Sequence, residues 1–254
     1  MLDTVILNIP RHQIRGIPDG KGGKSWDLYS RTRTYVKYVK NPPRGLHDGV
    51  YRPRLTGMKR YISRGQYASF LKIEFSAPKL IFGNNLEEVT DKDFSMVIDR
   101  LQDRLLEAGV IISKHNLENA IVTAFHPSKN IVLSGGYTAS LVSRELAKIN
   151  LNKKFDLDKS SYRNSGQSLQ AYTQVHAVVM YDKVADLAKP KKRAIDKDQV
   201  PNQLSLFRQI KTAQPSLEIL RFEIRLTQRQ KLNGVLKNLG LPINPTFAQV
   251  FKKD

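Results

Sequence analysis

Several segments of the chain alternate apolar and polar residues with a period of two. In residues 217–226, one set of side chains is apolar and the alternate set is charged: Leu220, Phe222, Ile224 and Leu226 against Arg221, Glu223 and Arg225. A shorter segment repeats this pattern, with Leu71, Ile73 and Phe75 against Lys72 and Glu74. Because successive side chains of a strand face opposite sides of a sheet, both segments are predicted strands. One face of each strand enters a core, and the other carries ionisable groups.

The remaining pattern predicts an α+β fold. Strands are expected at 5–9, at 31–40, twice within 54–81, at 120–126 and, after a turn at 164–166, at 168–180. Helices are expected from the N-cap Thr90 to Gly109, at 139–150, at 203–211 and before Gly240. The apolar stripes of the first two helices are Phe94, Val97, Ile98, Leu101 and Leu105, and Leu141, Val142, Leu146 and Ile149. The order of these elements predicts a central antiparallel sheet backed by helices.

Two segments lack such a pattern. Residues 11–30 are rich in Gly and Lys and predict a mobile basic loop, and 189–197 predicts a polar surface connector. No internal repeat is visible, so we expect one domain over residues 1–254. The first ten residues lack the basic start and long apolar run of a signal peptide, and charges interrupt every apolar run elsewhere. We therefore expect a cytoplasmic protein without a membrane partner.

The charge balance points to a polyanionic partner. The chain has 42 Lys and Arg against 23 Asp and Glu, a formal net charge of +19. Nucleic acid is the leading partner, because a globular protein tolerates such an excess chiefly beside a polyanion. Ribosome association, an anionic membrane surface and a merely basic, soluble surface are the alternatives. The basic residues are interleaved with aromatic ones and form no detachable tail, which favours nucleic acid.

The segment 31–40 is the first predicted DNA-facing element, because its charges lie on one face of a β-ribbon. A charged edge strand that prevents aggregation is the alternative. Phosphate contacts are expected from basic side chains of residues 11–64 and of the strand at 217–226, with stacking on Trp26, Tyr35 or Tyr38. The predicted phosphate-binding residues are Arg31, Arg33, Lys37, Lys59, Arg60, Arg221 and Arg225.

Any metal site must use carboxylate, imidazole or water ligands, because the chain has no cysteine. This donor set suits Mg²⁺ or Mn²⁺. Glu74, His126 and Glu223 each belong to a predicted strand and could converge on a cation if the strands are neighbours. The alternative for the two glutamates is an ion pair with Lys72, Arg221 or Arg225, and the alternative for His126 is a structural role.

Tyr181 ends a predicted strand and is followed by Asp182 and Lys183. A phenol can attack a phosphodiester if a metal polarises the phosphate and a nearby cation, here Lys183, eases deprotonation. The product would be a phosphotyrosyl link that conserves the bond energy for rejoining. The alternative is a core or edge aromatic, and the chain has ten tyrosines.

Three segments in this order resemble the filamentous-phage replication initiators, the gene-two endonucleases: residues 1–10, 71–85 and 220–226. The pair Tyr-Asp-Lys at 181–183 and Arg-Phe-Glu at 221–223 is also similar to plasmid rolling-circle initiators. The resemblance implies a relaxase-like nicking-endonuclease architecture and nicking of one strand of origin DNA, single-stranded or locally melted. It also implies a 5′-phosphotyrosyl intermediate and a free 3′-OH that primes synthesis, with a host helicase and polymerase as partners.

On this resemblance, Tyr181 is the nucleophile, Lys183 its electrostatic helper, Glu223 and His126 the metal ligands and Glu74 a weaker third ligand. The family position that matches His126 is often an aspartate. Family members tend to continue past the segment that corresponds to Gly240, which leaves open whether a C-terminal module is missing. The rivals are a non-catalytic nucleic-acid-binding replication regulator and a metal-dependent nuclease that uses water.

Overall fold

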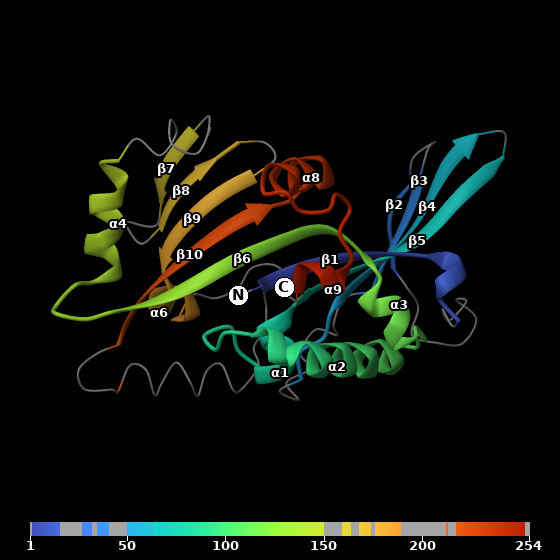
Figure 1. Ribbon diagram of the computed structural model, residues 1–254, viewed down its shortest axis with the longest axis horizontal. Helices are drawn as coiled ribbons and strands as arrows, with labels where there is room; N and C mark the ends of the chain where they lie inside the picture. Colours follow the sequence, from blue (N-terminus) through green and yellow to red (C-terminus); the bar gives the residue numbers. More distant parts are fainter. Residues whose placement is uncertain are drawn as a thin grey trace.

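The computed structural model describes residues 2–15, 27–31, 35–40, 50–63, 65–149, 159–163, 168–173, 176–188, 212 and 217–251. Ten strands in these ranges form one antiparallel sheet in the order β2-β3-β4-β5-β1-β6-β10-β9-β8-β7. Figure 1 shows β6 running along the middle of the molecule, with β2–β5 at one end and β7–β9 at the other. The α+β class and the antiparallel sheet with packed helices are therefore confirmed.

From each edge of the sheet inward, the strands follow chain order, from β2 to β5 and from β7 to β10, and β1 and β6 lie between β5 and β10. Their bounds are β1 Leu2–Pro10, β2 Asp27–Arg31, β3 Tyr35–Lys40, β4 Arg54–Ser63, β5 Gln66–Ser76, β6 Ile121–Leu133, β7 Lys159–Arg163, β8 Ser168–Tyr172, β9 His176–Asp182 and β10 Glu218–Leu226. The helices are η1 Arg11–Gln13, α1 Ala77–Phe82, η2 Asp91–Asp93, α2 Phe94–Glu107, α3 Lys114–Glu118, α4 Ala139–Ala147, α6 Lys183–Ala188, α8 Arg229–Asn238 and α9 Phe247–Phe251. None of the helices in the described ranges is long and apolar enough to span a bilayer.

The larger hydrophobic cluster lies where α1, α2 and α9 pack against β1, β5 and β6, and α8 joins it from beside β6 and β10 (Figure 1). Alternate residues of β1 are fully buried there, as the period of two requires. The predicted stripe of α2 supplies the facing side, and the N-terminal capping box between Thr90 and Asp93 is present. Gly109, at a φ of 77°, follows the helix in the left-handed conformation that favours glycine. This helix is thus confirmed from its cap to its end.

A second, smaller cluster joins α4 to one face of β8, β9 and β10. Val142 and Leu146 of the predicted stripe pack against it, but Leu141 and Ile149 are exposed. Leu220, Phe222 and Ile224 of β10 face this cluster, which leaves the charged set of β10 on the opposite side of the sheet. This second cluster therefore fixes which way the candidate functional groups point.

Several predicted boundaries were wrong. The strand at 31–40 is the end of β2 and β3; 168–180 is divided into β8 and β9; and 77–82 forms α1, whose first turn contains Pro78, where proline is tolerated. β6 continues to Leu133, so His126 lies within the strand and not at its end. Of the predicted basic loop, 11–13 is helical and 27–30 belongs to β2, while 16–26 lies outside the described residues, as do 189–197 and the predicted helix at 203–211.

Candidate functional site

Three neighbouring strands, β6, β10 and β9, bring the charged set of β10 beside Tyr181. In the register of the sheet, Arg221 is opposite Tyr181 on one side and opposite Asn130 on the other. Glu223 is opposite Ser128. Because directly opposite residues of antiparallel strands place their side chains on the same face, these groups share one polar face. The predicted convergence of Tyr181 and Glu223 is therefore real.

Glu223 is the centre of this polar face. Its carboxylate is almost fully buried, with the residue 4% exposed. Oε1 accepts a hydrogen bond from Nε of Arg225 at 2.9 Å and lies 3.4 Å from Nδ1 of His126. Oε2 accepts a long hydrogen bond from the Tyr181 hydroxyl at 3.4 Å. One carboxylate thus joins the predicted nucleophile to a predicted metal ligand.

The surroundings of Glu223 keep it ionised. Burial by itself would raise the pKa of this carboxyl group, but the contact with His126 and the hydrogen bond and charge of Arg225 outweigh burial. The charge of Arg221 adds to them, so the pKa of Glu223 lies well below its ordinary value. Glu223 is a carboxylate at neutral pH, and it is a poor proton acceptor.

Arg221 is fully buried and anchors the site to the rest of the sheet. Its Nη2 donates to Oδ2 of Asp3 at 2.6 Å and to Oγ of Ser128 at 2.8 Å. Its Nη1 donates to the carbonyl of Asn85 at 2.9 Å and to Oδ1 of Asn130 at 3.1 Å. The predicted DNA contact of Arg221 is therefore wrong, because a guanidinium with no exposed surface cannot reach a phosphate. Its role is to hold β1, β6 and the segment after α1 together behind Glu223.

Lys183 is also buried, at 2% exposure, and it begins α6 beside the end of β9. The side chain of Asp182 accepts a hydrogen bond from the backbone N–H of Ala185 at 2.8 Å, which caps this turn. Nζ of Lys183 lies 3.8 Å from Oδ2 of Asp186 and 5.9 Å from the centre of the Tyr181 ring. Burial, and then the charge of Arg221, lower the pKa of Lys183 to about 7. At neutral pH this amine can therefore take up or release a proton.

The buried amine makes the stability of the protein depend on pH. Because the pKa of Lys183 is about 7 in the folded chain and higher in the unfolded chain, the unfolded chain binds more protons between pH 7 and the ordinary value of 10.5. The unfolding free energy should therefore rise with pH across this window, and Lys183→Met should lack the rise. Below pH 6 we expect the variant to be the more stable protein by about 3 to 5 kcal/mol. Urea unfolding at pH 6, 8 and 9.5 measures the difference, with the exposed Lys237→Met as control; equal pH dependence in all three proteins would refute it.

Tyr181 is partly buried, and its hydroxyl faces the ion pairs of β10. Burial raises the pKa of this phenol well above its usual value; the positive charge of Arg221 opposes that shift, and the negative charge of Glu223 adds to it. The hydroxyl is therefore protonated at neutral pH. To act as a nucleophile it needs a proton acceptor or a bound cation, and Lys183 is the group nearby whose pKa suits the acceptor role.

The described residues bring together two of the three predicted metal ligands. His126 and Glu223 lie side by side, whereas Glu74 forms an ion pair with Lys72 at 3.4 Å, the alternative that the sequence left open for it. No group of three or more His, Asp or Glu residues in the described ranges could hold a metal ion. Glu223 is also already engaged by Arg225. The donor set therefore does not fit Mg²⁺ or Mn²⁺ as it stands, and the metal requirement stays a prediction.

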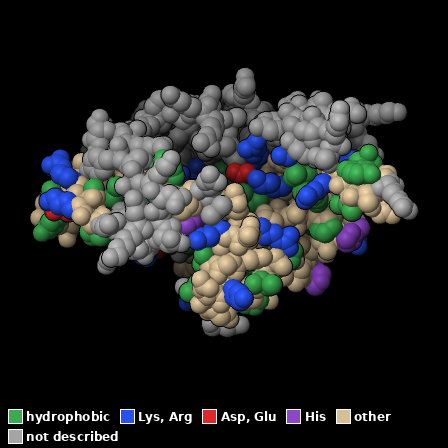
Figure 2. Space-filling model, turned by 90° about the horizontal axis from the view of Figure 1, so that it is seen from above, with side chains coloured by type: hydrophobic (Ala, Val, Ile, Leu, Met, Phe, Trp, Pro, Cys, Tyr) green, Lys and Arg blue, Asp and Glu red, His purple; other side chains and the backbone are tan. Residues whose placement is uncertain are grey.

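The predicted phosphate-binding residues have different outcomes. Lys59 and Arg60 are exposed on β4, and the side chain of Arg225 is 38% exposed beside Glu223. Lys37 lies on β3 and is half-buried. Figure 2 shows one face of the molecule on which Lys and Arg side chains far outnumber acidic ones. Outside the described residues or side chains lie Trp26, Arg31, Arg33, Tyr35 and Tyr38.

Sequence reasoning missed the partners of Arg221. Asp3 carried a usable signal, because it occupies the same phase of β1 as the buried residues Val5, Leu7 and Ile9. A carboxylate in a buried phase requires a buried partner. Ser128 and Asn130 carried no such signal, since the predicted strand stopped before them.

No family model matches the chain, and no curated protein or solved structure is significantly similar to it. The resemblance to phage and plasmid replication initiators therefore rests on the short segments of the sequence.

Proposed function

We propose that this protein nicks one strand of DNA through Tyr181, as an initiator of rolling-circle replication. The observation that carries the proposal is the position of the Tyr181 side chain, with its hydroxyl 3.4 Å from the carboxylate of Glu223 and its ring centre 5.9 Å from Nζ of the buried Lys183. A phenol, a proton acceptor and fixed cations are the parts that covalent attack on a phosphodiester needs. The nicking-endonuclease architecture and the origin as substrate come from the sequence resemblance.

The proposed nicking reaction is a transesterification and needs no oxidant or reductant. The phenolic oxygen of Tyr181 attacks phosphorus and forms a phosphotyrosyl bond, while the bond from phosphorus to the 3′-oxygen breaks. Neutral Lys183 accepts the phenolic proton, because the carboxylate of Glu223 is too weak a base. The 3′-oxygen takes a proton from the solvent and becomes a 3′-OH primer. The reverse reaction rejoins the strand.

The fixed charges stabilise the negative charge that develops on the phosphate. Arg225 has an exposed part and Glu223 sets its orientation, so this guanidinium can meet a phosphate at the mouth of the site. Arg221 contributes its charge from within the sheet. These groups need no rearrangement when the charge develops, which is the physical basis of electrostatic catalysis.

A non-catalytic regulator of replication is the second candidate function. The closed ion pairs of Glu223 with Arg225 and of Arg221 with Asp3 favour it, because such pairs also stabilise a sheet that only binds nucleic acid. The ion pair of Glu74 with Lys72, which keeps it apart from His126 and Glu223, favours it as well.

Covalent capture of DNA tests the proposal. The protein is incubated with Mn²⁺ and a pool of random single-stranded oligonucleotides labelled at the 3′ end, the end that stays with a 5′-phosphotyrosyl link. We expect a band that carries both label and protein on denaturing electrophoresis and that disappears after protease treatment. Sequencing the linked strands would then give the preferred site. Cleavage without linkage would support hydrolysis by water, and binding without cleavage would support the regulator; either outcome overturns the proposal.

A further inference from the structure

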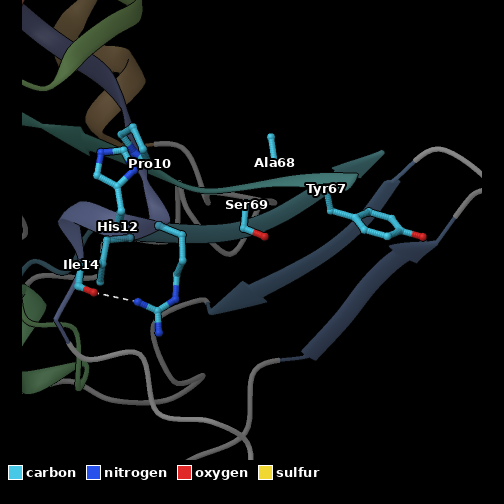
Figure 3. Close-up of a pocket in the computed structure, with 7 residues that line it drawn as sticks. Pro10, His12, Ile14, Tyr67, Ala68 and Ser69 are labelled. Atoms are coloured by element: carbon cyan, nitrogen blue, oxygen red, sulfur yellow. Dashed lines mark hydrogen bonds between the residues drawn. The ribbon is translucent and has the colours of Figure 1, made fainter. Parts of the chain in front are cut away.

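The β4–β5 hairpin extends beyond the end of β1. β1 stops at Pro10, which is paired with Phe70, whereas β5 begins four residues earlier, at Gln66. β1 ends at Pro10 and η1 follows, so no residue of β1 pairs with residues 66–69 of β5 in the described part of the chain. We call the place where β5 extends past the end of β1 the step. An open pocket of about 550 Å³ lies there, and its lining includes Arg11, His12, Tyr67 and Ser69 (Figure 3). This volume lies within the range of about 300 to 1,000 Å³ typical of ligand sites.

Two tyrosines stand beside the pocket on the hairpin. Tyr61 is opposite Tyr67 in the register, and their rings meet edge to face with centroids 5.6 Å apart. Tyr67 is 52% exposed and Tyr61 is 39% exposed. Nζ of Lys59 lies 4.6 Å from the centre of the Tyr67 ring. Two exposed aromatic rings that hold each other in place, with an ammonium beside one of them, form a stacking platform with a positive charge.

The surroundings of this platform are basic. Residues 59–69 contain Lys59, Arg60 and Arg64 and no acidic residue. Residues 10–15 add Arg11, His12 and Arg15, again without an acidic residue. Arg11 lines the pocket, and its Nη1 donates a hydrogen bond of 2.7 Å to the carbonyl of Ile14, which holds the guanidinium beside the pocket. A platform with this charge fits a polyanion that also carries flat rings.

We propose that the step beside Tyr67 is a binding subsite for single-stranded nucleic acid. A base stacks on Tyr67, while Lys59 and Arg11 bind the adjoining phosphates. The subsite lies on the arm of β2–β5 in Figure 1, and β1 and β6 separate β5 from β10. It would therefore hold the strand at a distance from Tyr181. This inference deepens the proposed function, but the binding itself does not require nicking.

Anisotropy of labelled oligothymidine of 20 nucleotides, titrated over a range of salt concentrations, tests the subsite. Tyr67→Ala should weaken binding by about 5- to 150-fold with an unchanged salt dependence, because it removes one base stack and no charge. Tyr67→Phe should bind within about twofold of the wild type, since it keeps the ring. The matched control is Tyr137→Ala, which removes a tyrosine that is 60% exposed in the turn after β6. Lys59→Gln should lower the slope of log affinity against log salt by about 0.7.

Equal affinities of Tyr67→Ala and Tyr137→Ala would overturn the subsite. A different occupant would also overturn it. This would be shown if Tyr67→Ala abolished self-association of the protein, or binding of an extended peptide along the edge of β5, while DNA binding stayed unchanged. The two proposals fail separately. If Tyr67→Ala weakens binding but the wild type forms no covalent adduct, only the nickase proposal is refuted. If the wild type forms the adduct but Tyr67→Ala binds DNA with full affinity, only the subsite proposal is refuted.

Discussion

Tyr181→Phe is expected to abolish the covalent protein–DNA adduct while the affinity for single-stranded DNA stays within about twofold of the wild type. The variant loses the attacking oxygen but keeps the ring on β9. The hydroxyl makes one long hydrogen bond, 3.4 Å to Oε2 of Glu223, so its removal should cost the fold about 1 kcal/mol or less. Adduct formation is measured by denaturing electrophoresis, and affinity by anisotropy.

The matched control for this variant is Tyr172→Phe. Tyr172 lies on β8, opposite Ala177 of β9, and thus on the same face of the sheet as Tyr181. We expect Tyr172→Phe to form the adduct at the wild-type rate. If Tyr181→Phe still formed the adduct and Tyr172→Phe did not, the nucleophile would be Tyr172 on β8 and not Tyr181.

Arg221→Met is expected to destabilise the protein by about 3 to 5 kcal/mol, because it leaves the buried carboxylate of Asp3 without its cation. The side chain of Ser76 still donates to Oδ1 of Asp3 at 2.7 Å, which does not replace the charge. Urea unfolding at pH 7 measures the loss.

The double variant Asp3→Asn with Arg221→Met separates the lost ion pair from lost packing. If an unpaired carboxylate is the cause, the double variant recovers part of the stability that the single variant loses. Arg100→Met, on the exposed face of α2, is the control and should change stability by about 0.5 kcal/mol or less. A single variant no less stable than this control would contradict the anchoring role of Arg221.

The elements with a clear period were predicted well from the sequence. β10 shows this, because its alternation separates the residues that pack against α4 from those that form the polar site. α2 shows it again, since Thr90, the apolar stripe and Gly109 together define one helix. Such elements are decided locally, by side chains that must face one core.

The rest of the site depended on how the strands are arranged. Arg221 was predicted to face DNA, because alternation distinguishes two faces of a strand but does not say whether the polar face is open. That face is covered where β1 and the segment after α1 approach it, a contact of residues more than a hundred positions apart in the chain. The predicted position of Glu74 beside His126 was wrong because it also depended on the order of the strands. β5, which carries Glu74, lies two places from β6 in the sheet, and strand order cannot be read from the period of a single strand.

The position of the covalent link is the most direct measure of the central claim. After reaction with DNA, the adduct is treated with nuclease and trypsin, and the peptides are sequenced by tandem mass spectrometry. Trypsin releases residues 164–183, a peptide that contains both Tyr172 and Tyr181, so fragmentation must assign the nucleotide to one of them. We expect a nucleotide 5′-phosphate on Tyr181. A nucleotide on any other residue, or cleaved DNA with an unmodified peptide, would contradict it.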